Sequence, residues 1–291
     1  MDWTDRRERL RAVIGGKRCI YPGSVFDPIS ARIAEDLGFE AMMFAGSIAS
    51  FMVLGAPDII QLTLTEFAQQ AYRINRAGKL PLLVDADHGY GNALNVKRTV
   101  EELETAGVSG LTIEDTLLPT PYGATAASLI PIAEGVGKMK AALAGRQDKR
   151  LVIVGRTSAM AISGVDDTIA RLKAYEDAGV DMLFMVGVKT RAQLDAVAAA
   201  VKLPLFLGSA GPELYDLDYL SARNVRVCLQ GHLPFMAAVN ATYETLKALR
   251  NGTPPANIKG VASGDLMKQV TRQADYAAWS KDFLNAGLGG G

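Results

Sequence analysis

Short apolar runs recur along the chain, and each is followed by a stretch whose apolar positions have helical spacing. A short, uninterrupted apolar run is typical of a strand that is buried on both faces. The eight runs are Cys19–Phe26, Ala41–Ala45, Leu82–Asp85, Gly110–Glu114, Leu151–Gly155, Met182–Val186, Leu205–Leu207 and Val225–Leu229. The pattern therefore predicts eight buried strands.

The segments between these runs predict helices. In Thr65–Ala77, Thr65 can cap the first turn, while Phe67, Ala71 and Ile74 share one face. Further helices are predicted over Asn95–Ala106, Asp166–Ala178 and Pro234–Leu249. Glycine, which accepts the left-handed conformation that ends a helix, follows at Gly38, Gly78, Gly107 and Gly179.

The order of strand, helix and glycine predicts an α/β fold of the (β/α)₈ TIM-barrel type. A doubly wound open sheet is the alternative, but it would carry a glycine-rich turn after its first strand, and Gly23-Ser24-Val25-Phe26-Asp27 is not such a turn. We predict one barrel domain over residues 1–291. Its C-terminal helical extension, residues 252–285, begins near the break at Pro254-Pro255.

Composition narrows the class of function. Lys plus Arg and Asp plus Glu both number 31, and a formal net charge of zero argues against a nucleic-acid or membrane-surface partner. No apolar run approaches the roughly 20 residues of a membrane span. Cys19 and Cys228 lie inside apolar runs, which favours free thiols in a reducing cytoplasm. We expect a cytoplasmic protein that acts on a small molecule.

Acidic residues stand where the third and fourth strands end. Asp85 and Asp87 alternate, so on a regular strand they share one face, and Glu114 closes the next strand. Chemistry in such barrels gathers at the carboxyl ends of the strands. Mg²⁺ prefers oxygen ligands and keeps several of its waters. These acids therefore predict a magnesium site, although one of them could instead cap a helix or pair with an arginine, and Asp115 is expected to be structural.

Two other strand ends offer groups that could bind an anion. Arg156 follows the fifth run and could form an internal salt bridge with Glu114 or Asp87, a role compatible with binding a carboxylate or an enolate oxygen. Gly46-Ser47 follows the second run and offers backbone N–H groups and a hydroxyl to a carboxylate, or forms a plain tight turn.

The chain contains two histidines, His88 and His232, and both follow strands. A single histidine often serves only as a hydrogen-bonding group, but the strand-end position favours a functional role for His232. His88 lies between Asp87 and Gly89, which favours a role in orienting the loop.

These motifs resemble the isocitrate lyase/phosphoenolpyruvate mutase superfamily from about Ser24 to His232. The motifs are Asp85-Ala86-Asp87-His88-Gly89-Tyr90-Gly91-Asn92, Thr112-Ile113-Glu114-Asp115, and Gly46-Ser47 ahead of Asp58. Gly231-His232 and Leu117-Leu118-Pro119 are similar to its magnesium-dependent oxaloacetate decarboxylase branch.

The resemblance implies a cofactor, an assembly and roles for individual residues. It implies Mg²⁺, with Mn²⁺ as an alternative, and a homotetramer whose subunits exchange the eighth helix. Asp85 would bind the metal directly, while Asp58, Asp87 and Glu114 would hold its waters. Gly46, Ser47 and Ile48 would bind the substrate carboxylate. Arg156 and His232 would contact the 2-oxo acid substrate and carry the catalysis.

The implied reaction is decarboxylation of oxaloacetate to pyruvate and CO₂ through a metal-stabilised enolate. The family's carbon–carbon lyases carry a Lys-Lys-Cys-Gly-His loop, whereas Thr116–Ile130 contains no cysteine, which argues against isocitrate or methylisocitrate cleavage. Decarboxylase relatives tend to place a tyrosine after strand seven, but Gly208-Ser209-Ala210-Gly211 has none. Arg156-Thr157-Ser158 has serine where asparagine or aspartate is common.

Two alternatives to decarboxylation follow from these departures. One is another C–C or C–P bond lyase or hydrolase of the superfamily, such as a phosphonopyruvate hydrolase or an enzyme like 2-methylisocitrate lyase. The other is a non-catalytic barrel that binds a dicarboxylate.

Overall fold

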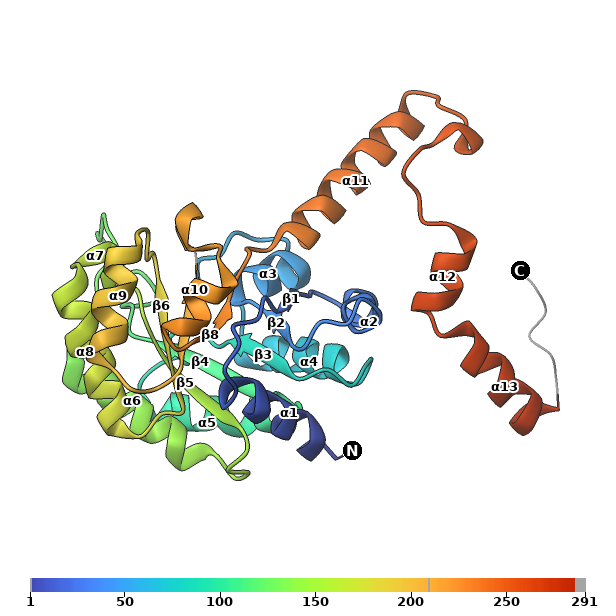
Figure 1. The fold of residues 1–291 in the computed structure, drawn as a ribbon. Helices are drawn as coiled ribbons and strands as arrows, with labels where there is room; N and C mark the ends of the chain where they lie inside the picture. Colours follow the sequence, from blue (N-terminus) through green and yellow to red (C-terminus); the bar gives the residue numbers. More distant parts are fainter. Residues whose placement is uncertain (1, 209, 286–291) are drawn as a thin grey trace. The chain divides into compact units, whose positions relative to one another are not determined.

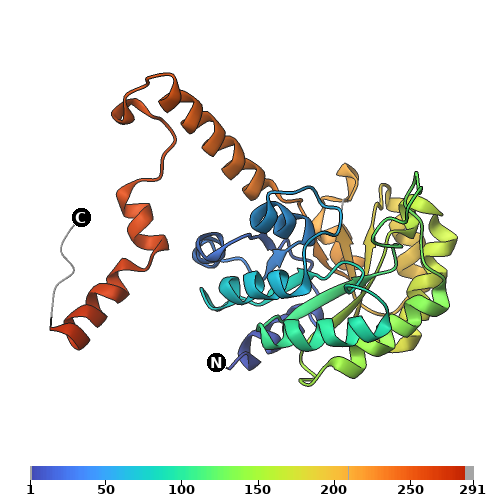
Figure 2. The same ribbon diagram turned by 180° about the vertical axis from the view of Figure 1, so that it is seen from behind.

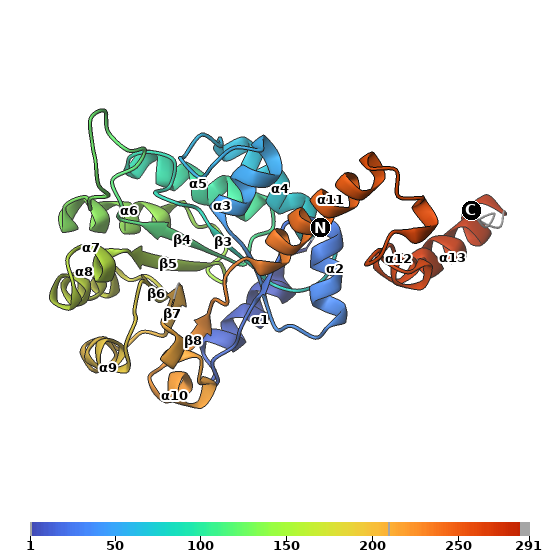
Figure 3. The same cartoon turned by 90° about the horizontal axis from the view of Figure 1, so that it is seen from above.

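The computed structural model describes residues 2–208 and 210–285, and within them eight parallel strands lie in one sheet in chain order. Figure 3 shows this order from the third strand to the eighth. The strands are β1 (Gly23–Ser24), β2 (Met42–Phe44), β3 (Leu82–Asp85), β4 (Gly110–Glu114), β5 (Val152–Thr157), β6 (Met182–Val186), β7 (Leu205–Gly208) and β8 (Val225–Cys228). Helices connect the strands and surround the sheet (Figure 1). The predicted (β/α)₈ fold class is confirmed.

The sheet closes on itself through Ile20, which lies just before β1. The Ile20 N–H donates to the Arg226 carbonyl at 2.9 Å, and the Cys228 N–H donates to the Ile20 carbonyl at 3.0 Å. The first predicted strand, Cys19–Phe26, is thus shorter than expected. Pro22 has no N–H to continue the ladder, which leaves two short pairing segments. Closure brings the end of β1 beside the segment that follows β8.

Helices fill the connections of the barrel. They are α1 (Thr4–Ile14), α2 (Pro28–Asp36), α3 (Gly46–Ala49), the π-helix η1 (Ser50–Leu54), α4 (Leu64–Asn75), α5 (Ala93–Thr105), α6 (Ile132–Gly145), α7 (Ala159–Ile162), α8 (Val165–Ala178), α9 (Arg191–Ala200), the 3₁₀ helix η2 (Pro212–Leu214) and α10 (Leu217–Ala222). Helix α5 lies between α4 and α6, as Figure 2 shows. The predicted cap of α4 was wrong: Thr63, in a capping box with Glu66, begins this helix, not Thr65.

Apolar side chains from the strands fill the barrel. Met43, Leu83, Val152, Val154, Met182, Phe184, Phe206 and Val227 form this core. Leu10 and Ile14 of α1 join the same core. Arg7 of α1 also donates from Nε to the carbonyl of Val108, which precedes β4. Helix α1 therefore covers the amino-terminal ends of the strands, and the carboxyl ends remain available for a site.

The contacts divide the chain into two units, residues 1–233 and 234–291. The described part of the second contains nearly all of α11 (Leu233–Arg250), η3 (Pro255–Asn257), α12 (Gly264–Val270) and α13 (Gln273–Leu284). This boundary precedes the predicted start of the extension at residue 252. None of the described helices is long and apolar enough to cross a bilayer.

Candidate active site

A cavity of about 470 Å³ lies at the carboxyl ends of the barrel strands. Its walls bring together seven of the residues that the sequence predicted for the site: Ser47, Asp58, Asp85, Asp87, Glu114, Arg156 and His232. Two other predicted residues, Gly46 and Ile48, are buried in α3 and do not line it. The barrel thus gathers groups that are up to 185 positions apart (232 − 47) in the sequence.

Asp85 and Asp87 reach this cavity in different ways. Asp85 is the last residue of β3, and one of its oxygens accepts a hydrogen bond of 2.8 Å from the Thr112 hydroxyl. Asp87 lies beyond the strand and has a φ of 48°, in the left-handed region that non-glycine residues avoid. The strand alternation expected from the sequence therefore does not place Asp87; a strained turn does.

Arg156 lies among the acids as part of β5, not after it. Its guanidinium forms ion pairs with Asp85 and, at 3.2 Å, with Glu114. Burial lowers the pKa of Arg156, but these carboxylates outweigh that effect and raise it above its usual value. Of the two alternative partners predicted for Arg156, Glu114 is confirmed, and the second ion pair is with Asp85. The Nε of Arg156 is buried without a partner in the described residues.

The four carboxylates carry more negative charge than Arg156 can balance. Burial, followed by repulsion from Asp85, Glu114 and Asp58, raises the pKa of Asp87 well above its ordinary value. Burial also raises the pKa of Glu114 and of Asp58, despite the opposing effect of Arg156. A cation would relieve this repulsion, and an all-oxygen donor set suits Mg²⁺ or Mn²⁺.

The acids do not form a compact cluster of ligands. Among the residues that the structure describes, no group of three His, Cys, Asp or Glu side chains could hold a metal ion directly. The predicted arrangement needs only one direct ligand, because Mg²⁺ keeps several waters that neighbouring carboxylates can hold. The residues present fit a hydrated magnesium ion better than a closed structural metal site.

The two histidines have different surroundings. His232 lines the cavity, and its Nδ1 lies 2.9 Å from the Ser24 hydroxyl oxygen. Burial lowers the pKa of His232, although Asp85 opposes this effect. His88 is 3% exposed and does not line the cavity, while its carbonyl accepts a hydrogen bond of 2.9 Å from Lys138. This position agrees with a role for His88 within its loop.

Sequence reasoning gave no site role to several other residues around the cavity. Phe184 of β6 holds its ring 5.3 Å from the Arg156 guanidinium carbon. Tyr215 lines the cavity after β7, where a tyrosine seemed absent because Gly208 and its neighbours offered none; Ser209 lies outside the described residues. Ser24 at the end of β1 contacts His232, and no role was predicted for it. No motif in the sequence marks Phe184, Tyr215 or Ser24 as part of a site, because each stands alone or within an apolar run.

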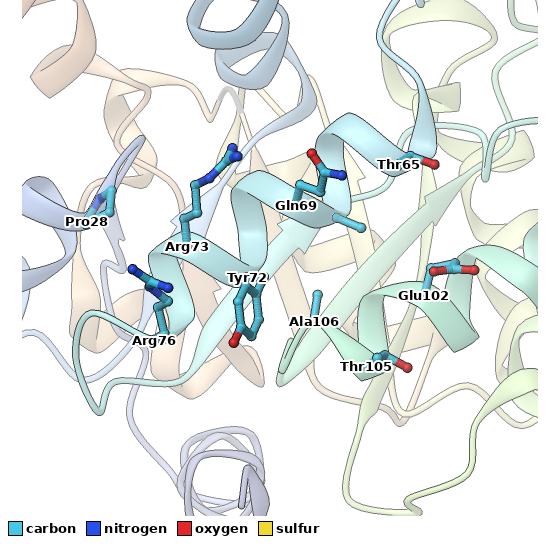
Figure 4. Close-up of a pocket in the computed structure, with 10 residues that line it drawn as sticks. Pro28, Thr65, Gln69, Tyr72, Arg73, Arg76, Glu102, Thr105 and Ala106 are labelled. Atoms are coloured by element: carbon cyan, nitrogen blue, oxygen red, sulfur yellow. The ribbon is translucent and has the colours of Figure 1, made fainter. Parts of the chain in front are cut away.

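A second cavity, of about 600 Å³, lies outside the barrel along α4 and α5 (Figure 4). Arg73 of α4 and Arg76, which follows that helix, line it together with Tyr72, and Glu102 of α5 is its one acidic residue among those described. It offers no group of carboxylates to a hard cation. The cavity at the strand ends is the one that combines acids, Arg156 and His232 among the residues that the structure describes.

Comparisons with known proteins find relatives along nearly the whole chain. The family model of phosphoenolpyruvate phosphomutase matches residues 11–250. An oxaloacetate decarboxylase from Bradyrhizobium diazoefficiens is 59% identical over 98% of this chain and 99% of its own length. An oxaloacetate decarboxylase from Rhodopseudomonas palustris strain BisB18 is 60% identical, also over 98% and 99%.

Solved structures of related proteins have a similar fold over nearly the whole chain. A phosphonopyruvate hydrolase in complex with oxalate and Mg²⁺ superposes with a TM-score of 0.85, at 27% identity over 96% of this chain and 99% of that one. An oxaloacetate acetylhydrolase bound to 3,3-difluorooxalacetate has a TM-score of 0.84, at 28% identity over 95% and 96%. The chain therefore belongs to the phosphoenolpyruvate phosphomutase family, within the isocitrate lyase/phosphoenolpyruvate mutase superfamily.

Proposed function

We propose that this protein is a magnesium-dependent decarboxylase that converts oxaloacetate to pyruvate and CO₂. The observation that carries the proposal is the cavity in which four carboxylates, Arg156 and His232 meet at the strand ends. Full-length relatives at about 59% identity are named oxaloacetate decarboxylases, which supports this substrate. A reaction that separates charge on a small 2-oxo acid suits such a site.

The carboxylates would hold the cation. Asp85 is the proposed direct ligand, and Asp58, Asp87 and Glu114 are proposed to hold its waters. When bound, Mg²⁺ supplies a Lewis acid that draws electrons toward the substrate's carbonyl oxygen. The excess of negative charge, seen in the raised pKa values of Asp58, Asp87 and Glu114, supports this assignment.

Other residues would bind and orient the substrate. Ser47 at the cavity wall would offer its hydroxyl to the C1 carboxylate. The backbone N–H groups of Gly46 and Ile48 in α3 are proposed to complete that cradle, although neither residue lines the cavity. His232, which lines the same cavity, is proposed to contact the C4 carboxylate that departs as CO₂. When the C3–C4 bond breaks, its electron pair moves toward the C2 oxygen and CO₂ leaves.

Arg156 would stabilise the negative charge that develops on the C2 oxygen. Its guanidinium is buried among acids, and its Nε–H has no partner in the described part of the chain. A preorganised donor in a buried site stabilises such charge more strongly than water does. Solvent then delivers a proton to C3 and completes pyruvate.

The test is to mix purified protein with oxaloacetate and Mg²⁺ and to follow pyruvate with and without EDTA. We expect turnover above the spontaneous metal-catalysed rate, which Asp85→Ala abolishes without changing the circular dichroism of the fold. Mg²⁺ should also raise the melting temperature of the wild type but not of the variant. A rate no faster than the spontaneous one would reject decarboxylation.

A substrate panel separates the alternatives. The structural similarity to phosphonopyruvate hydrolase and oxaloacetate acetylhydrolase makes phosphonopyruvate cleavage and release of oxalate the reactions to include. Stabilisation by oxalate and Mg²⁺ without turnover of any substrate would favour the non-catalytic dicarboxylate-binding barrel.

We also propose a cytoplasmic homotetramer in which α11 packs against a second copy of the chain. The described α11 has no buried residue, although Leu233, Met236, Val239, Tyr243 and Leu246 form an apolar series along it. An exposed apolar series of this length is typical of a protein–protein contact. Cys19 and Cys228 are both free and buried, which suits a reducing compartment.

A further inference from the structure

The hydroxyl of Ser24 and the ring of His232 form a contact that none of the proposed roles includes. Ser24 is the last residue of β1, and His232 follows β8. Closure of the barrel through Ile20 and β8 brings these two strand ends together. The Ser24 hydroxyl oxygen then lies 2.9 Å from Nδ1 of His232, a normal hydrogen-bond distance.

This contact uses Nδ1 and leaves Nε2 of His232 available for another hydrogen bond. Within the residues described, Nε2 of His232 has no hydrogen-bond partner, and the side chain lines the cavity with the carboxylates. A neutral imidazole has one N–H donor and one acceptor nitrogen, and the partner of one nitrogen decides the role of the other. The Ser24 hydroxyl can therefore determine what His232 presents to a ligand.

We propose that Ser24 is a positioning residue that donates its hydroxyl proton to Nδ1 of His232 and so keeps Nε2 protonated. Nε2–H is then a hydrogen-bond donor toward the C4 carboxylate of oxaloacetate. The opposite tautomer would present a lone pair to a negatively charged group. This inference rests on the proposed function, because it assigns the ring to the carboxylate that leaves.

The test is a double-mutant cycle with Ser24→Ala and His232→Gln. We expect Ser24→Ala to lower kcat/KM for oxaloacetate about 10-fold, the order that one hydrogen bond supplies. It should have no further effect when His232 is already glutamine, because Ser24 acts through that ring. Ser24→Thr keeps a hydroxyl and should restore most of the rate. Mg²⁺-dependent binding of oxalate, which has no departing carboxylate, should not change.

The control is Ser109→Ala. Ser109 is buried, whereas Ser24 is partly buried; it precedes β4 at the other end of the barrel, and its hydroxyl has no partner in the described residues. It should leave the kinetics unchanged. An equal loss from Ser24→Ala in both backgrounds, or no loss in either, would overturn the inference while wild-type turnover still upheld the proposed function.

Nitrogen-15 NMR tests the tautomer without activity. The chain has two histidines, so a His88→Gln spectrum assigns the ring of His232. We expect a protonated Nε2 and an unprotonated Nδ1 in the wild type. The reverse tautomer would reject the role of Ser24, whether or not the enzyme decarboxylates oxaloacetate.

Discussion

The position of Asp87 depends on a single glycine. A Cβ atom added to Gly46 would lie 2.5 Å from Oδ1 and 2.7 Å from Oδ2 of Asp87. No side chain fits there unless the carboxylate moves. Gly46 does not line the cavity, but it permits the left-handed turn at Asp87 to bring its carboxylate among the other acids.

Gly46→Ala should therefore disturb the proposed cation site more than the fold. We expect the Mg²⁺ concentration for half-maximal activity to rise about 10-fold or more, the effect typical of displacing a supporting residue of a metal site. Magnesium titrations of activity, with thermal melts as a check on folding, measure this.

Gly137→Ala is the matched control, since nothing lies within 4 Å of its added Cβ on α6. It should leave the magnesium dependence unchanged and stabilise the helix slightly. A Gly46→Ala enzyme with the wild-type titration would show that Asp87 does not help to hold the ion.

At the scale of elements, the loop between β3 and α5 is held by buried hydrogen bonds from two helices. Lys138 of α6 donates to the carbonyl of His88, and the Thr99 hydroxyl of α5 donates to the carbonyl of Gly89 at 3.0 Å. Asn92 then caps α5 in a capping box with Asn95. Hydrogen bonds thus join the loop that contains the strained turn to two helices.

His88 makes the stability of this loop depend on pH. Burial, reinforced by Lys138, lowers the pKa of His88 to about 4, below its unfolded value of 6.5. Between these pH values the unfolded chain binds more protons than the folded protein. The contribution of His88 to the free energy of unfolding is therefore complete above pH 6.5 and is lost as the pH falls toward 4. From pH 7 to pH 5 this loss amounts to about 2 kcal/mol.

Urea unfolding at both pH values measures this loss. His88→Gln should lose less stability than the wild type over the same interval, because glutamine does not titrate. Parallel losses in the two proteins would mean that His88 has the same pKa in the folded and the unfolded state.

At the scale of the whole molecule, the proposed assembly depends on α11. Met236, Val239, Tyr243 and Leu246 follow one another at spacings of three and four, so they share one face of this helix. We expect light scattering to give the mass of a tetramer. Met236→Glu with Val239→Glu should reduce that mass, because two charges would be buried in the contact.

Thr245→Glu, on the opposite face of α11, is the control and should leave the mass unchanged. A monomeric wild type would reject the assembly, and a tetramer that survives both charges would place the contact elsewhere on the chain.

Much of the fold follows from local patterns. Seven predicted strands lie within one or two residues of their expected bounds. A buried strand requires a short apolar run, and such a run is a local feature that can be recognised in the sequence itself. The first strand was predicted too long because Pro22 interrupts the pairing. Thr63 rather than Thr65 caps α4 because the reciprocal bond with Glu66 decides between two threonines of similar propensity.

The sequence by itself determined the barrel and the kinds of group at its mouth, because apolar periodicity and the residues that follow each strand are local properties of the chain. Only the tertiary structure decided how those groups meet: Arg156 with Asp85, Ser24 with His232, and Asp87 against Gly46. The reason is physical. Such contacts depend on the closure of the barrel, on burial and on the backbone conformation of single residues. Each joins residues that are far apart in the sequence.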